Sequence, residues 1–298
     1  MTQRIGFIGI GLMGHGMAKN LLAKGFQLTL RVHRNRANVQ DLLDAGATEV
    51  ATNALVAKNA DIVFLCVTGS PQVEEVVFGN HGLCEGAREG MIVVDCSTSE
   101  PESTRRVREQ LEPAGVKFVD APLTRTPKEA EEGRLNTMVG ADPGTFNAIK
   151  PALEAFCENV FHVGPPGSGH TVKLLNNFIA MTIAAASAEA FAAAAKAGIG
   201  ADKLAQVISA GAVNNGIFQA MYKTFSGDLA GLKFALDNAR KDVRYYTHLT
   251  ESLTMPSPVG DAVHQSFVQA SALGFGASFV PSLVEAQEKL VGVKILPR

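Results

Sequence analysis

Lys173 is the residue of this chain best placed to do chemistry. It lies in the stretch Gly164 to Asn177, where three glycines and two prolines predict a loop. An alanine-rich segment follows to about Lys196 and predicts a long helix. Lys173 and Asn177 are four residues apart, so a helix places both on one face. Together with Asn176 they could handle a proton and a polar substrate, or they could form an ordinary solvated first turn.

A second motif with chemical meaning is the glycine-rich run of residues 9–14. It follows a short apolar segment and precedes a helical pattern that ends near Gly25, which is the strand–turn–helix context of a dinucleotide site. Gly9 permits the tight turn, Gly11 lets a pyrophosphate approach the backbone, and Gly14 lets the helix pack against the strand. The alternative is a glycine turn without a ligand. The residues predicted to bind the cofactor phosphates at the helix N-terminus are Gly9, Ile10, Gly11, Leu12, Met13 and Gly14.

The end of the next predicted strand, residues 28–32, bears on the choice between NAD and NADP. NAD enzymes usually place a carboxylate there to bind the ribose, but this chain has three arginines within six residues and no acidic residue. A guanidinium suits a 2′-phosphate, so we predict that NADP is preferred. NAD remains possible if the arginines form only a solvated strand end. The candidate contacts are His33, Arg34, Asn35 and Arg36.

These residues together fit the oxidation of an alcohol or the reverse reduction. The nicotinamide of a bound cofactor takes or supplies the hydride, and the protein must supply a base or an acid. Tyr222, Tyr245 and Tyr246 lack the Tyr-x-x-x-Lys spacing, which leaves Lys173 as the best candidate. In the direction of reduction, protonated Lys173 would donate to the carbonyl oxygen and stabilise the developing negative charge.

Alternating strand and helix signals must position this machinery. Further strands are predicted at residues 61–67, 91–95, 117–120 and 136–139, with helices at 53–59, 71–78, 101–114 and 143–156. This rhythm predicts a largely parallel sheet with helices on both faces. Ligands of such sheets bind at the carboxyl ends of the strands. The candidates there are Val67, Thr68 and Thr98 for the cofactor and Thr124 and Thr126 for the substrate, although a hydroxyl at such a point can equally cap a helix.

After Lys196 the pattern contains helices only. They are predicted at residues 201–210, 217–225, 234–252, 259–273 and 280–290, with glycine or proline at their joints. We therefore predict an α/β domain over residues 1–163 and an all-α domain over residues 164–298. A long interdomain helix at about residues 168–196 joins them.

Composition and charge exclude several classes of protein. Hydrophobic residues make up 46% of the chain, which indicates a globular protein, and a net charge of −2 without a basic stripe argues against nucleic-acid binding. The apolar run 178–195 is long enough to raise the question of a membrane span, but it is mostly alanine, so a buried helix is favoured. The histidines and the four cysteines show no metal-ligand or C-x-x-C spacing. Without a signal peptide they predict reduced thiols, a cytoplasmic location and no metal site.

Taken in order, the motifs resemble those of the β-hydroxyacid dehydrogenases, the family of 3-hydroxyisobutyrate dehydrogenase and tartronate semialdehyde reductase. Residues 6–14 and 17–21 match the opening signature, 120–122 the start of the substrate motif, 164–177 the catalytic motif and 241–242 a late Lys-Asp pair. The resemblance covers nearly the whole chain. It implies a Rossmann-like N-terminal domain, a long interdomain helix and an all-helical domain. It also implies that Lys173 is the catalytic acid/base, that Asn177 holds the substrate, and that Thr98 and Lys241 contact the cofactor.

One departure from the family concerns the substrate. The family motif usually continues Val-Ser-Gly-Gly, whereas this chain reads Leu123-Thr124-Arg125-Thr126, which is similar to sulfolactaldehyde reductases. We predict that a small acidic molecule binds to Thr124, Arg125, Thr126 and Asn176. The candidates are 3-hydroxyisobutyrate-like acids, tartronate semialdehyde or glycerate, and sulfolactaldehyde. The alternative is that Arg125 points outward to solvent.

Other functional classes share this pattern in part. A non-catalytic, chromatin-associated member of the family lacks the lysine and imine reductases usually replace it, so Lys173 counts against both. The decarboxylating 6-phosphogluconate dehydrogenase needs a larger helical domain than this chain offers. The small residues of the alanine-rich segment permit close helix approach and predict a homodimer or homotetramer.

Overall fold

The computed structural model describes residues 3–33, 36 and 39–297 of the chain. These residues form two compact units, Met1–Lys173 and Leu174–Arg298. The division lies inside a long helix, α8 (Ser168–Lys196). The boundary predicted from the sequence, between residues 163 and 164, lies a few residues before the start of this helix. Each unit is described by itself.

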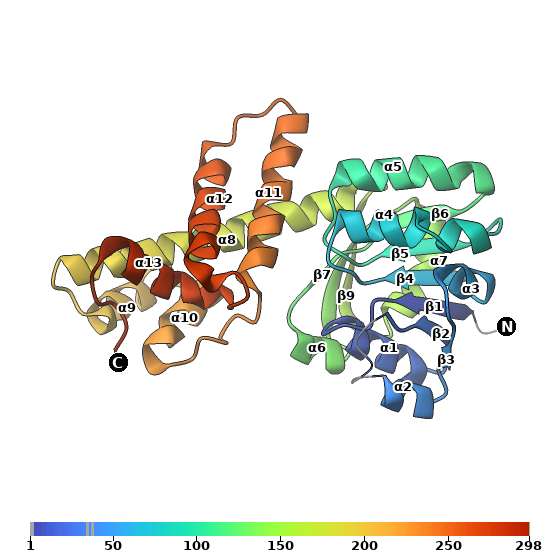
Figure 1. The fold of residues 1–298 in the computed structure, drawn as a ribbon, viewed down its shortest axis with the longest axis horizontal. Helices are drawn as coiled ribbons and strands as arrows, with labels where there is room; N and C mark the ends of the chain where they lie inside the picture. Colours follow the sequence, from blue (N-terminus) through green and yellow to red (C-terminus); the bar gives the residue numbers. More distant parts are fainter. Residues whose placement is uncertain (1–2, 34–35, 37–38, 298) are drawn as a thin grey trace. The chain divides into compact units, whose positions relative to one another are not determined.

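The first unit is built on a nine-stranded sheet in the order β3-β2-β1-β4-β5-β6-β8-β7, with β9 paired to β8 (Figure 1). From β3 to β6 all neighbours are parallel, as predicted, whereas β8 pairs antiparallel with both β6 and β7 and parallel with β9. The strands are β1 (Arg4–Ile8), β2 (Gln27–Arg31), β3 (Thr48–Glu49), β4 (Ile62–Leu65), β5 (Ile92–Asp95), β6 (Lys117–Asp120), β7 (Leu123–Thr124), β8 (Leu135–Gly140) and β9 (Cys157–Gly164).

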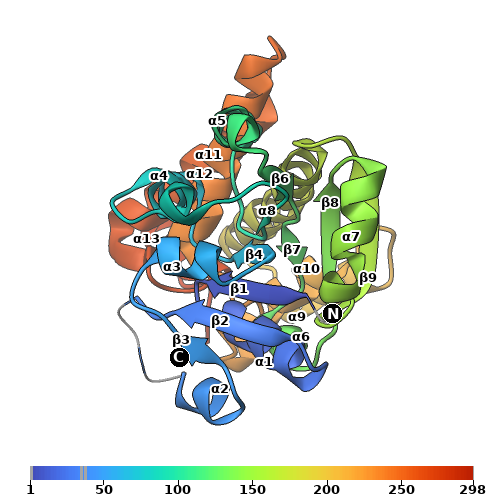
Figure 2. The same ribbon diagram turned by 90° about the vertical axis from the view of Figure 1, so that its right-hand side faces the viewer.

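Helices cover both faces of this sheet (Figure 2). Successive residues of β4 point to opposite faces of the sheet and pack into different cores. Phe64 packs into a core with α1, α2, α6 and α7, and Leu65 packs into a second core with α3, α4 and α5. A strand buried on both faces needs an unbroken apolar sequence, which β4 and β5 have. The helices are α1 (Gly14–Ala23), α2 (Gln40–Asp44), α3 (Asn53–Lys58), α4 (Ser70–Phe78), α5 (Pro101–Leu111), α6 (Pro127–Glu131) and α7 (Pro143–Leu153).

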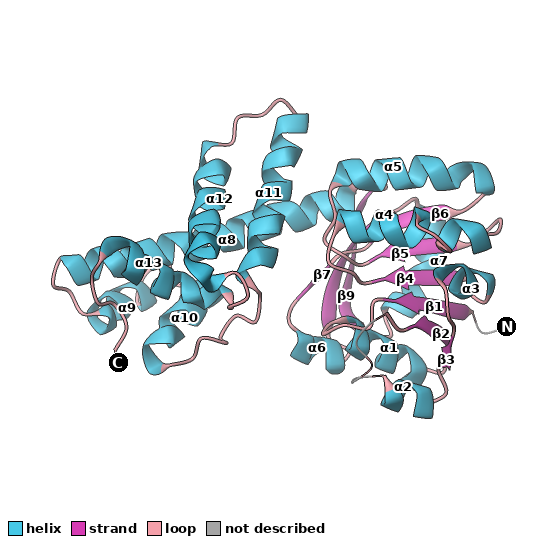
Figure 3. Ribbon diagram, in the orientation of Figure 1, coloured by secondary structure: helices cyan, strands magenta, loops and turns pink. Residues whose placement is uncertain are grey.

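The second unit is helical, and α8 runs into its core. Ala184 and Ala188 of α8 are fully buried beside Phe267 of α12, and Phe191 stacks on Phe218 of α10 with ring centroids 5.7 Å apart. Figure 3 shows helices and connecting loops throughout this unit. After α8 its helices are α9 (Ala201–Ser209), α10 (Gly216–Tyr222), α11 (Leu236–Ser252), α12 (Pro258–Ala270) and α13 (Leu283–Val291).

Among the described residues, α8 is the one helix whose length and composition would suffice to cross a membrane. In its most apolar window 44% of the residues are buried within the protein. The buried residues include Ala184 and Ala188, which belong to the core of the second unit. One side of α8 is therefore packed inside the protein, as the sequence predicted for this segment.

Candidate active site

The glycine turn joins β1 to α1 with the geometry that each glycine was predicted to serve. Gly9 has φ 104°, and a Cβ there would lie 2.2 Å from the carbonyl oxygen of Cys66. A Cβ on Gly14 would lie 2.0 Å from the Gly9 carbonyl oxygen, so the start of α1 can approach β1 only without a side chain. A Cβ on Gly11 would contact nothing within 4 Å. This arrangement fits a dinucleotide, because the exposed backbone at Gly11 can meet a pyrophosphate.

The region predicted to bind the ribose is only partly described, since Arg34 and Asn35 lie outside the described residues. His33 is exposed. The guanidinium of Arg36 forms a two-bond ion pair with Glu49 of β3, with N–O distances of 2.8 and 2.7 Å. Arg31 donates to the side chain of Asn53 at 2.9 Å. Two of the three arginines therefore already have protein partners.

The loops that follow β4 and β5 are tied together by Ser97. Its hydroxyl accepts the N–H of Val67 at 3.0 Å, and its own N–H donates to Asp95 Oδ1 at 2.9 Å. Thr68 and Thr98 lie in these loops, at the carboxyl edge of the sheet where the glycine turn also lies. Val67, Thr68 and Thr98 thus lie along the same edge of the sheet as the glycine turn.

The three predicted substrate contacts near β7 differ in their surroundings. Thr124 ends β7, half-buried. Arg125 has φ 80°, a conformation that favours glycine, and its Nη1 donates to the carboxylate of Glu158 and to the Arg134 carbonyl. Thr126 begins α6 in a capping box with Glu129, to which its N–H donates at 3.0 Å. Arg125 is thus held by protein groups, and Thr126 has the structural role of a cap.

Lys173 is half-buried near the start of α8, within the first unit. That start is fixed by Asp120, the last residue of β6, whose carboxylate accepts the backbone N–H groups of Gly167 (2.6 Å) and His170 (2.8 Å). Because β1 and β6 belong to the same parallel set, Lys173 follows a helix start attached to the edge that carries the glycine turn. The sequence analysis assigned no role to His170 and identified Asp120 only as part of a motif.

The remaining candidates lie in the second unit, where Asp242 organises them. Asn177 is 7% exposed and donates from its amide to Asp242 Oδ2 at 2.7 Å, while its own Oδ1 accepts from Asn176 at 3.0 Å. Lys241 Nζ lies 2.8 Å from the other oxygen of Asp242 as an ion pair, and 4.7 Å from the centre of the Tyr245 ring. Asp242 itself is buried, and sequence reasoning identified it only as half of the Lys-Asp pair.

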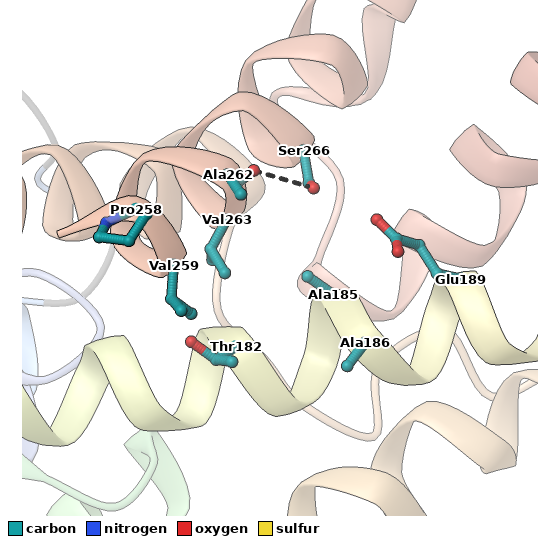
Figure 4. A pocket seen from close by; sticks show the side chains of 9 residues that line it. All are labelled: Thr182, Ala185, Ala186, Glu189, Pro258, Val259, Ala262, Val263 and Ser266. Atoms are coloured by element: carbon teal, nitrogen blue, oxygen red, sulfur yellow. Dashed lines mark hydrogen bonds between the residues drawn. The ribbon is translucent and has the colours of Figure 1, made fainter.

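A pocket of about 340 Å³ lies between α8 and α12 of the second unit (Figure 4). Thr182 and Glu189 of α8 face Val259 and Ser266 of α12 across it, and its wall is otherwise mainly alanine, valine and proline. It contains none of the predicted catalytic, substrate or cofactor residues. In the described part of the chain no group of three His, Cys, Asp or Glu side chains could hold a metal ion.

Comparison with known families agrees with this geometry. Residues 4–164 match the family described as the NAD binding domain of 6-phosphogluconate dehydrogenase. Residues 167–284 match the family described as NAD-binding of NADP-dependent 3-hydroxyisobutyrate dehydrogenase. Both compact units are therefore covered by families of nicotinamide-cofactor enzymes.

Individual relatives align along nearly their whole length. The chain is 32% identical over 294 residues to 2-(hydroxymethyl)glutarate dehydrogenase of Eubacterium barkeri, covering 98% of this chain and 97% of that protein. It is 33% identical over 283 residues to 3-sulfolactaldehyde reductase of Escherichia coli K12, covering 94% of each. The crystal structure of a 3-hydroxyisobutyrate dehydrogenase from Salmonella typhimurium superposes with a TM-score of 0.83 at 28% identity, covering 95% of this chain and 99% of that one.

Fold, glycine turn and relatives together define an NAD(P)-dependent oxidoreductase with a Rossmann-like domain and a helical domain. The chain belongs to the β-hydroxyacid dehydrogenase family.

Proposed function

We propose that this enzyme interconverts a short, acidic β-hydroxyacid and its semialdehyde, with Lys173 as the general acid and base and NADP as the preferred cofactor. The observation that carries the role of Lys173 is its position: it follows a helix start that Asp120 attaches to the carboxyl edge of the sheet. The glycine turn opens at that same edge.

When bound in the reduced form, the cofactor would supply the hydride for the reduction. The ammonium group of Lys173 donates a proton to the substrate's carbonyl oxygen and stabilises the negative charge that develops there. In the oxidation, neutral Lys173 accepts the proton of the hydroxyl group. Asn177, whose amide donates to Asp242, has a fixed orientation in which it can hold the substrate.

Replacing Lys173 with Ala tests this role. We expect kcat to fall about 10²–10⁴-fold, which is the usual contribution of a positioned acid or base. The affinity for the reduced cofactor, measured by fluorescence titration, should change little because the glycine turn is intact. Near-normal turnover would show that another group handles the proton.

The proposed preference for NADP rests on the arginines at the end of β2, of which Arg36 pairs with Glu49 and Arg31 donates to Asn53, while Arg34 lies outside the described residues. We expect NADPH to bind more tightly than NADH. Arg34→Ala should weaken NADPH binding about ten- to a hundredfold, the value of a charge-assisted contact, and should leave NADH binding nearly unchanged. Arg36→Ala is the matched control with a smaller effect. Equal affinities of the wild-type enzyme for the two cofactors would refute the preference.

Arg125 is the residue that we propose to select the substrate. One guanidinium nitrogen is bonded to Glu158 and the Arg134 carbonyl, and the group carries further N–H donors on its other two nitrogens. These can form a bidentate contact with a carboxylate or sulfonate. The relatives named for sulfolactaldehyde and hydroxymethylglutarate support a substrate with such an additional acidic group.

A substrate panel measures this selection. It contains sulfolactate, 2-(hydroxymethyl)glutarate, glycerate and 3-hydroxyisobutyrate, each tested with both cofactors. Arg125→Gly should raise KM for the preferred substrate about ten- to a hundredfold and shift the ranking towards 3-hydroxyisobutyrate. Arg125→Lys should restore part of the loss, and Glu158→Gln, which removes the competing negative charge beside the guanidinium, should lower KM. An unchanged KM and ranking in Arg125→Gly would eliminate the role.

We further propose that the chain forms a homodimer or homotetramer through its second unit and acts in the cytoplasm. Large apolar side chains are exposed on that unit, including Ile179 of α8 and Leu253, Met255 and Val259 around the turn between α11 and α12. Light scattering coupled to size-exclusion chromatography measures the mass. A monomer at micromolar concentration would refute the assembly.

A further inference from the structure

Two buried aspartates end adjacent strands of the sheet. Asp95 and Asp120 are the last residues of β5 and β6 and are partners in the parallel register. Both are 0% exposed. Because a carboxylate removed from water must find hydrogen-bond donors within the protein, the partners of these two residues reveal what the strand ends hold in place.

Asp120 holds the start of α8. Its two oxygens accept the backbone N–H groups of Gly167 and His170, which are otherwise unsatisfied at a helix N-terminus. Gly169, between them, allows the close approach, since a Cβ there would lie 2.4 Å from the carbonyl oxygen of Met138. The first turn of α8 is therefore fixed to the end of β6 by its backbone.

Asp95 holds the loop that follows β5. Its Oδ1 accepts the N–H of Ser97, and its Oδ2 accepts the hydroxyl of Ser99 at 2.9 Å. Since Ser97 also accepts the N–H of Val67, Asp95 reaches the loop after β4 through one intermediate. Both loops carry residues predicted to contact the cofactor.

His170 joins these two groups. Its ring is fully buried, and Nδ1 lies 2.6 Å from the hydroxyl of Thr104. That hydroxyl donates to the Glu100 carbonyl, so Nδ1 carries a hydrogen and donates to Thr104. The other nitrogen, Nε2, makes no hydrogen bond within the described residues and lies 3.6 Å from Asp95 Oδ2. At that distance the two atoms make no hydrogen bond, so the ring packs against the buried carboxylate without donating to it.

We propose that His170 is a positioning residue for Lys173. Its backbone is held by Asp120, and its ring is hydrogen-bonded to Thr104 and packs beside Asp95, so one residue couples the cofactor loops to the first turn of α8. Lys173 is three residues further along the helix, on a neighbouring part of the same face. This role rests on the proposed function of Lys173 and assigns no contact between His170 and the substrate.

Loss of the ring should displace Lys173 relative to the cofactor without removing any substrate contact. We expect His170→Ala to lower kcat about ten- to a hundredfold, because a displacement of about 1 Å has effects of that size. Substrate KM and the Kd for NADPH should change little. His170→Gln, whose amide can replace the hydrogen bond of Nδ1 to Thr104, should recover much of kcat. Thr104→Val, which removes the partner of Nδ1 together with that hydroxyl's bond to the Glu100 carbonyl, should give an intermediate loss.

His162→Gln is the matched control. His162 is a histidine of the same unit whose Nε2 lies 2.8 Å from the Ala141 carbonyl and whose ring stacks on Phe146, with centroids 4.4 Å apart. It should lose stability while keeping kcat. All variants are assayed well below their melting temperatures, which are measured by circular dichroism.

A folded His170→Ala variant with wild-type kcat overturns the positioning role. If that variant does not fold, a folded Thr104→Val variant with wild-type kcat overturns it instead. Lys173→Ala separates this failure from failure of the proposed function. An inactive Lys173→Ala beside an active His170→Ala leaves the function intact, whereas an active Lys173→Ala removes the function itself.

Discussion

Replacing Asp242 tests two proposals at once: that this residue stabilises the second unit, and that it orients Asn177 to hold the substrate. It is 2% exposed and accepts the Asn177 amide at 2.7 Å while pairing with Lys241 at 2.8 Å. Asp242→Ala removes the acceptor of the Asn177 amide and the ion-pair partner of Lys241. A hydrogen bond to a charged group contributes about 1.5–3 kcal/mol, and the ion pair, whose lysine side chain keeps 17% exposure, adds about 0–1 kcal/mol.

The expected loss for Asp242→Ala is therefore about 2–4 kcal/mol. For a unit of this size that corresponds to a fall in melting temperature of about 6–12 °C. Asp242→Asn keeps an oxygen acceptor for Asn177 and loses only the ion pair, so its fall should be smaller. Glu251→Gln, an exposed position of the same helix, should stay within about 0.5 kcal/mol of the wild type.

The assay combines thermal unfolding with steady-state kinetics. If Asn177 holds the substrate, Asp242→Ala should also raise substrate KM, whereas Asp242→Asn should raise it less because the amide keeps its acceptor. A melting temperature unchanged from that of Glu251→Gln would refute the energetic reasoning. A large loss of stability with unchanged KM would show that Asp242 serves the fold alone.

Further predictions concern pH and thiol chemistry. Burial lowers the pKa of His15, but hydrogen bonds to Glu131 and Asp41 outweigh it and raise this pKa above 6.5. Protonated His15 therefore stabilises the folded protein below pH 6.5. This contribution is lost as the pH rises through the pKa of the folded state. His15→Gln should therefore cost more stability at pH 6 than at pH 9 in urea titrations, and equal costs would contradict the ion pairs. A neutral alkylating agent at pH 8 should modify one cysteine of the native protein, Cys84, because its side chain is exposed. Cys66 should stay unmodified, because burial raises the pKa of its thiol to about 12. Mass spectrometry counts the adducts, and modification of Cys66 at the same rate would refute this.

Much of the fold could be predicted because strong local patterns determine it. The buried strands β4 and β5 are apolar throughout, and the long helices after α8 are separated by glycine or proline. The elements missed were short or exposed. β3 and β7 have two residues each, α2 and α6 have five, and β9 is mostly half-buried or exposed and lacks a clean alternation. Such elements form because of tertiary pairing, which a local pattern does not contain.

The site was predictable to the extent that it consists of local motifs. The reasons given for Gly9 and Gly14 are steric and local, and the structure displays the close contacts they imply. The pairing of Arg36 with Glu49 and of Arg125 with Glu158 depends on strands brought together by the fold. No spacing rule indicates such partners, and the roles assigned to these residues stay predictions.

The backbone of Arg125 has a consequence for how such enzymes change substrate. At φ 80° a side chain costs about 1–2 kcal/mol that glycine does not incur. Every glycine codon differs from an arginine codon by one base, so the family's usual residue and the one found here are a single mutation apart. Replacing Arg125 with glycine would remove the conformational strain at this position, which stabilises the fold. It would also remove the ion pair with Glu158, which destabilises the fold. If Arg125 selects the substrate as proposed, an evolving population could exchange substrate preference at this position with little net change in the stability of the fold.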